Sequence, residues 1–85
     1  GEGVELTPSE YAILTTLCQN VGRPYSRLQL LNATLGESYA GYERAIDTHV
    51  SNLRKKIESN PQKPVYILTV HGLGYKFGDQ YEVNQ

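Results

Sequence analysis

The sequence has a single cysteine and few other side chains that bind metals. Cys18 has no second cysteine with which to form an internal disulfide, which excludes a disulfide-stapled mini-protein and favours the reducing cytoplasm. One cysteine and two histidines do not supply the usual four ligands of a structural zinc site. No apolar stretch approaches the roughly 18 residues that a membrane-spanning helix needs. The sequence therefore predicts no metal, no cofactor and no membrane segment.

The chain is short, and its charge is unevenly distributed. Its 85 residues suit one small domain, and no repeat, low-complexity tract or linker divides them. The overall net charge is −1, but residues 44–77 carry six basic and two acidic residues, a net charge of +4. Clustered positive charge is typical of a nucleic-acid site, although a solvated helix face is the alternative interpretation.

Residues 7–20 are predicted to form the first helix. Thr7 suits the N-cap, Pro8 the first helical position, and Glu10 the third position of a capping box. The apolar residues that follow at helical spacing are expected to be the buried face. They are Tyr11, Leu14, Leu17 or Cys18, and Val21. On this interpretation Cys18 is a buried core residue rather than a reactive thiol. Residues 4–6 would end an earlier strand.

A second, shorter helix is predicted from a second capping box. Ser26 and Gln29 have the N-cap and third-position spacing. Its apolar face is expected to consist of Leu28, Leu31 and Leu35, with the helix ending at Gly36. Residues 36–42, which contain two glycines and two tyrosines, form the predicted loop to the third helix.

The third helix, over about residues 43–59, is predicted to have two contrasting faces. One face is apolar: Ile46, Val50, Leu53 and Ile57. The other, which we name the polar stripe, consists of Arg44, Thr48, Ser51, Asn52 and Lys55. A plain amphipathic helix facing water is the alternative. Such a helix usually carries Glu/Lys pairs, and the polar stripe has no acid, which favours DNA reading.

A β-hairpin is predicted after the third helix. Residues 65–70 are β-branched and aromatic, residues 71–74 form a glycine-rich turn, and residues 75–77 return. Three helices followed by a two-stranded hairpin is the order of an α+β winged helix-turn-helix, in which one helix enters the major groove. The hairpin would lie beside that helix and present His71 and Lys76 to the DNA backbone or minor groove.

The polar stripe has the chemistry needed to read bases. Asn52 suits paired hydrogen bonds to adenine, Lys55 a guanine edge, and the Thr48 methyl a thymine methyl, while Arg44 is placed for a phosphate. An enzyme is not predicted, because the sequence offers no nucleophile with an oriented base. Asp47 is expected to be structural and to pair with Arg44 or hydrogen-bond to Ser51.

Four segments resemble the OmpR/PhoB family of bacterial response-regulator effector domains: residues 6–11, 25–31, 44–57 and 67–77. The third is specific through Arg44, Asp47 and His49 followed by Leu-Arg-Lys-Lys, and the fourth through Thr-Val-x-Gly-x-Gly-Tyr. The resemblance implies a cytoplasmic, non-enzymatic transcription factor of a two-component phosphorelay. Its third helix would enter the major groove of promoter DNA, with the wing on the backbone or minor groove.

The resemblance also implies roles for individual residues. The candidates that face bases are Thr48, Ser51, Asn52 and Lys55. The candidates that contact phosphates, or support such contacts, are Arg44, His49, Arg54, Thr69, His71 and Tyr75. At the wing tip His71 stands where the family usually has arginine, so contact there is expected to depend on pH near 6–7. The candidates for contact with RNA polymerase are Glu37, Ser38, Tyr39 and Tyr42.

Further expectations concern domain organisation and partners. Residues 1–85 are read as one winged-helix domain with a core over 6–77, whose N-terminal sheet is largely missing, either as a fragment or as a naturally short form. Two copies would bind direct-repeat half-sites as a homodimer on DNA. A sensor kinase would act on a receiver domain that is absent here. The alternative function is a protein-interaction module that contacts RNA polymerase or a partner domain.

Overall fold

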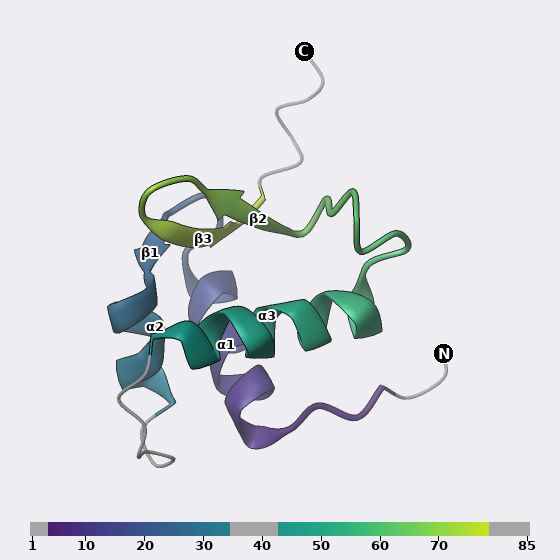
Figure 1. Ribbon diagram of the computed structural model, residues 1–85, viewed down its shortest axis with the longest axis horizontal. Helices are drawn as coiled ribbons and strands as arrows, with labels where there is room; N and C mark the ends of the chain where they lie inside the picture. The colour runs from purple at the N-terminus through teal and green to yellow at the C-terminus, as the bar shows by residue number, and fades with distance from the viewer. Residues whose placement is uncertain (1–3, 35–42, 79–85) are drawn as a thin grey trace.

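The computed structural model describes residues 4–34 and 43–78, where three helices accompany a small antiparallel sheet (Figure 1). The elements are α1 (Pro8–Gln19), β1 (Tyr25–Ser26), α2 (Arg27–Ala33), α3 (Arg44–Ile57), β2 (Ile67–Val70) and β3 (Gly74–Phe77). α1 and α2 pack against α3, and the β2–β3 hairpin lies along one side of α3 (Figure 1). The predicted α+β winged-helix order is confirmed.

Local hydrogen bonds start α1 and α2 where the sequence predicts. The Thr7 hydroxyl accepts from the Glu10 amide at 3.2 Å, and the Glu10 carboxylate accepts from the Thr7 amide at 3.0 Å. Ser26 and Gln29 form the same reciprocal pair at 3.0 and 2.8 Å. Each box satisfies amides that the first turn leaves without a helical partner. α1 ends at Gln19 with Asn20 as its C-cap, as predicted.

The buried face of α1 differs from the prediction. Tyr11 is 61% exposed and Val21 45% exposed, and Cys18 is also exposed rather than part of the core. Leu17 is fully buried and Leu14 packs against the core, as predicted, and Ile13, which was not predicted, is fully buried with them. α1 has apolar residues on two faces, so periodicity alone does not decide which face turns inward. Packing against α3 decides which face of α1 turns inward, because Lys56 of α3 bonds to the capping carboxylate of Glu10 on α1.

The inner face of α2 also differs from the prediction. Leu30 is fully buried and Leu31 packs against the core, whereas Leu28 is 53% exposed. α2 contacts both α1 and α3, and these two neighbours select the side that carries Leu30. Leu35, Gly36 and the predicted loop over 36–42 lie outside the described residues.

The apolar face of α3 is confirmed and forms the centre of the core. Ile46, Val50 and Leu53 are fully buried, and Ile57 packs at the edge of the core. The core of the described residues comprises Ile13, Leu17, Tyr25, Leu30, Ile46, Val50, Leu53, Ile67 and Tyr75. α3 is therefore held along its whole length by side chains from both other helices and from the sheet.

The sheet contains a strand that the sequence does not predict. Its order is β1-β3-β2, with Tyr25 opposite Tyr75 and Thr69 also opposite Tyr75. β1 has only two residues, too few for a sequence pattern. A Cβ at Gly74 would clash with the Tyr25 carbonyl oxygen, so this close pairing requires glycine. Residues 4–6, expected to end a strand, have no regular secondary structure.

The connection from α3 to the hairpin depends on one buried carboxylate. Glu58 follows α3 and is 6% exposed. Its two oxygens accept hydrogen bonds from the amides of Val65, Tyr66 and Ile67 at 2.8–3.2 Å. Glu58 therefore holds the segment that leads into β2. β2 begins at Ile67 rather than at residue 65 as predicted.

Candidate nucleic-acid interface

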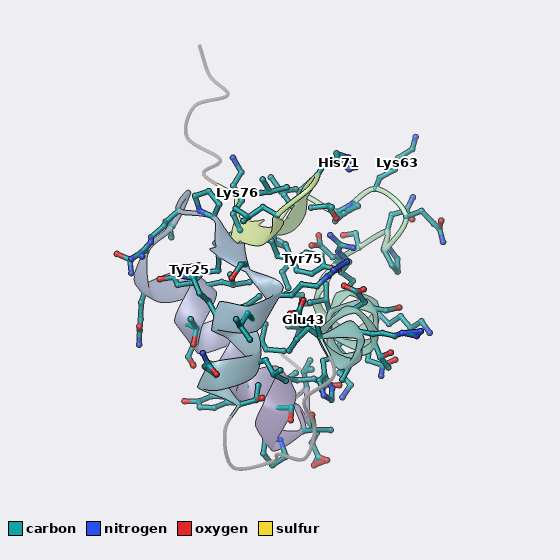
Figure 2. The ribbon with its side chains drawn as sticks, turned by 60° about the vertical axis from the view of Figure 1, so that its left-hand side comes forward. Tyr25, Glu43, Lys63, His71, Tyr75 and Lys76 are labelled. Atoms are coloured by element: carbon teal, nitrogen blue, oxygen red, sulfur yellow. The ribbon has the colours of Figure 1, made fainter. Side chains whose placement is uncertain are left out.

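The polar stripe lies on the outer side of α3. Arg44, Thr48, Ser51 and Lys55 are exposed, and Asn52 is half-buried. Among the described residues, no other side chain forms a hydrogen bond or an ion pair with these five. Figure 2 looks nearly along α3 and shows its outer side chains radiating away from the rest of the molecule. Their donors and acceptors are thus available to an external partner.

One flank of α3 is attached to the hairpin through Arg54. The Arg54 guanidinium donates to the Ile67 carbonyl at 3.1 and 2.8 Å and to the Thr69 hydroxyl at 2.9 Å. Its central carbon lies 5.5 Å from the centroid of the Tyr75 ring, within the range of a cation–π contact. Arg54 therefore joins α3 to both strands of the hairpin.

Asp47 strengthens the same flank. The Tyr75 hydroxyl donates to the Asp47 carboxylate at 2.6 Å, and Arg27 Nε donates to the same oxygen at 3.1 Å. Figure 2 shows Tyr75 between the hairpin and α3. Burial raises the pKa of Tyr75 to about 12, and the hydrogen bond to Asp47 adds to this effect. The phenol is thus a proton donor throughout the neutral range.

The partners of Asp47 correct a prediction made from the sequence. Asp47 was expected to pair with Arg44 or to hydrogen-bond to Ser51, one turn away on the same helix. Its partners instead come from α2 and β3. Helical spacing shows only which neighbours on the same helix are within reach. The side of α3 that carries Asp47 faces α2 and the hairpin, and those elements supply stronger partners.

The opposite flank of α3 is attached to the start of α1. Lys56 donates to the Glu10 carboxylate at 2.6 Å and to the Glu5 carbonyl at 3.1 Å. His49 is half-buried on the same flank, where its charge acts on Glu10. Burial of Glu10 opposes its ionisation, but the hydrogen bonds from Lys56 and from the Thr7 amide outweigh this and lower its pKa. Both flanks of α3 are therefore braced.

The tip of the hairpin is a tight turn. Leu73 donates its amide to the Val70 carbonyl at 2.9 Å, and Gly72 has a φ of +82°, a conformation that favours glycine. Thr69 and His71 are exposed, and Figure 2 shows Lys76 pointing away from the helices. A depression of about 280 Å³ lies between this turn and Arg27. The turn thus lies beside α3 and presents polar groups.

The structure places the predicted site residues on two adjoining elements. The polar stripe lies on the outer side of α3, and Thr69, His71 and Tyr75 lie on the hairpin that is bonded to α3. Glu37, Ser38, Tyr39 and Tyr42 lie outside the described residues. Sequence reasoning missed Arg27, whose partner is 20 residues away in the chain, and Glu58, whose partners are 7 to 9 residues away. The one feature of the sequence that could have indicated these two residues is a charged side chain next to apolar positions.

Comparison with known proteins identifies the family. The family model described as "Transcriptional regulatory protein, C terminal" matches residues 1–77. The chain belongs to this family of OmpR/PhoB-type DNA-binding domains. The family is one of transcription-factor domains rather than of enzymes. No helix within residues 4–34 and 43–78 has the length and apolar character needed to cross a membrane.

Individual family members resemble this chain closely. The alkaline phosphatase synthesis transcriptional regulatory protein PhoP of Bacillus subtilis is 48% identical over 73 residues, covering 86% of this chain and 30% of PhoP. The chain therefore spans about a third of the length of such relatives.

Two solved structures have the same fold. The response regulator DrrB of Thermotoga maritima, an OmpR/PhoB homologue, has a TM-score of 0.79 at 34% identity, covering 89% of this chain and 34% of DrrB. The Klebsiella pneumoniae RstA DNA-binding domain in complex with the RstA box has a TM-score of 0.76 at 36% identity, covering 92% of this chain and 77% of that domain.

Proposed function

We propose that this chain binds double-stranded promoter DNA sequence-specifically, as the effector domain of a response regulator. The observation that carries the proposal is the polar stripe, which has no partner among the described side chains and lies on a helix braced along both flanks. α3 enters the major groove, whose width admits one helix. The neighbouring hairpin contacts the backbone or the minor groove. The family and the RstA–DNA complex support this function.

Roles are proposed separately for the two sets of residues. Thr48, Ser51, Asn52 and Lys55 read base edges. Arg44, His49, Thr69 and His71 contact phosphates or the minor groove. Arg54 and Tyr75 have protein partners, which supports a role in holding the hairpin against α3 rather than a direct contact.

The proposal extends to the wider setting of the chain, and the resemblance to longer response regulators supports it. We place the chain in the cytoplasm of a bacterium, where a sensor kinase acts on a separate receiver domain. Two copies bind direct-repeat half-sites about one helical turn apart. Glu37, Ser38, Tyr39 and Tyr42 engage RNA polymerase.

The first test is selection from a random duplex library with the 85-residue chain at two salt concentrations. We expect enrichment of a short motif and binding that weakens steeply with salt. Binding that enriches no motif and is insensitive to salt, by a chain that circular dichroism shows to be folded, would instead indicate a protein-interaction module.

Variants then separate base reading from phosphate contact. Arg44→Ala should weaken binding to all sequences and lower the slope of log K against log salt by about 1. Asn52→Ala should cost about 1–3 kcal/mol at one base position only. Asn32→Ala is the matched control, because Asn32 is exposed on α2, and it should leave affinity unchanged. Equal losses at every position for Asn52→Ala would contradict its reading role.

A further inference from the structure

The Arg27 guanidinium is hydrogen-bonded through Nε, while its two terminal nitrogens are available to a ligand. Its Nε donates to Asp47 at 3.1 Å, and 44% of its side chain is exposed. Within residues 4–34 and 43–78, the two terminal nitrogens of the guanidinium have no hydrogen-bond partner. Arginine has five N–H donors in a rigid fork. One donor is used to orient the group, and four remain for a ligand.

Arg27 lines the depression beside the wing. The depression has a volume of about 280 Å³ and is lined by Arg27 and by hairpin residues that include Thr69, His71 and Tyr75. The opening is therefore bordered by a cation, a hydroxyl and the backbone of a tight turn. These are the groups that proteins use to bind phosphate oxygens.

The charge balance at this junction is positive. The charges of Arg27 and Arg54 act on the Tyr75 hydroxyl, and Asp47 is the one acidic group that acts on it. Asp47 also accepts the Tyr75 hydroxyl proton in a 2.6 Å hydrogen bond. Arg54 uses its donors on Ile67 and Thr69. Arg27 pairs with Asp47, whereas Arg54 bonds only neutral groups, so two cations and one carboxylate leave the junction with a net positive charge.

We propose that Arg27 binds a backbone phosphate of DNA in this depression, and that Asp47 is the positioning residue that orients it. This inference rests on the proposed function and adds to it a contact from α2, outside the polar stripe. Because Asp47 contacts both Arg27 and Tyr75, the same carboxylate aligns the α2 contact with the wing. A phosphate contact contributes the same affinity to every sequence and makes it depend on salt.

The main test compares Arg27→Gln with Arg23→Gln in the 85-residue chain. Arg23 precedes α2 on the same stretch and lies over the Tyr25 ring, so its substitution removes the same charge away from the depression. The probe is a fluorescent mixed-sequence duplex of about two helical turns, roughly 20 base pairs. Arg27→Gln should lower the salt slope by about 0.9, and Arg23→Gln should not. Equal effects of the two variants would overturn the proposal.

The positioning role of Asp47 has a test of its own. Asp47→Asn adds one unit of positive charge, so general electrostatics predicts tighter duplex binding. If Asp47 instead orients Arg27, Asp47→Asn should bind the duplex more weakly. In a chain that already carries Arg27→Gln, adding Asp47→Asn should then cause no further decrease in the salt slope. Tighter binding by Asp47→Asn would overturn the role of Asp47. Urea unfolding should confirm that Arg27→Gln, a surface change, alters stability by no more than about 0.5 kcal/mol.

The result separates this inference from the proposed function. If the unmodified chain shows salt-dependent duplex binding and Arg27→Gln keeps its slope, the Arg27 contact is wrong and DNA binding stands. If the unmodified chain shows no such binding, both are wrong. Arg27→Lys keeps the charge without the Nε donor, so it should retain the slope while binding more weakly.

Discussion

The inner side and the outer side of α3 differ in burial and in their bonds to other elements. Ile46, Val50 and Leu53 are fully buried on the inner side, and Asp47 and Lys56 on the flanks make short bonds to other elements. On the outer side, no described side chain pairs with the polar stripe. The residues of α3 that stabilise the fold are therefore different from the residues that are available to bind DNA. Substitutions should change stability or affinity, but rarely both.

The largest expected effect is on the inner side. Leu53→Ala empties a fully buried position and should lower the free energy of unfolding by about 2–5 kcal/mol. The measurement is urea unfolding followed by circular dichroism. Lys55→Ala, two residues along on the polar stripe, is the matched control and should change stability by no more than about 0.5 kcal/mol. Similar losses in both variants would remove the distinction between the two sides.

The junction with the hairpin should show an intermediate effect. Glu58→Gln replaces one carboxylate oxygen by an NH₂ group that faces amide donors, so some of the bonds to Val65, Tyr66 and Ile67 are lost. Stability should decrease by about 1–3 kcal/mol. Amide hydrogen exchange should accelerate first in β2. Unchanged exchange there would show that Glu58 does not anchor the hairpin.

The smallest effect is expected on the α1 flank and depends on pH. Burial opposes ionisation of Glu10, but Lys56 and the Thr7 amide outweigh it and hold its pKa below the ordinary 4.5. The stabilisation is therefore present above about pH 4.5 and is lost as the pH falls through the folded-state pKa. Glu10→Gln should be less stable at neutral pH by about 1 kcal/mol or less. Urea midpoints should show this gap closing as the pH falls below 4.5, and a gap that persists in strong acid would contradict the assignment.

α1 and α3 show how far the sequence predicts the fold. In α3 the apolar residues lie on one face, so periodicity identifies Ile46, Val50 and Leu53 as core. In α1 apolar residues lie on two faces, and the sequence prediction was right for Leu14 and Leu17, chose the exposed Tyr11 and missed the buried Ile13. A hydrophobic pattern identifies the buried side only when a single side is apolar.

The candidate site divides in the same way. The polar stripe follows from helical spacing and from its lack of acids, and it is found exposed, apart from the half-buried Asn52. The partners of Asp47 do not follow from spacing, because Arg27 is 20 residues away and Tyr75 is 28 residues away in the chain. Predicting them requires the relative placement of α2, α3 and the hairpin.

The sequence by itself determined the features that depend on nearby residues. These are the two capping boxes, the apolar and polar faces of α3, and the glycine turn at Gly72. Hydrogen bonds across three or four residues and a helical repeat need no other part of the molecule. Only the tertiary structure decided the inward face of α1, the pairing of β1 with β3, and the partners of Asp47 and Glu58. The partners of Glu58 are 7 to 9 residues away, beyond the spacing of a helix or a turn. The other pairings join residues remote in the chain, and packing of the helices against the sheet brings them together.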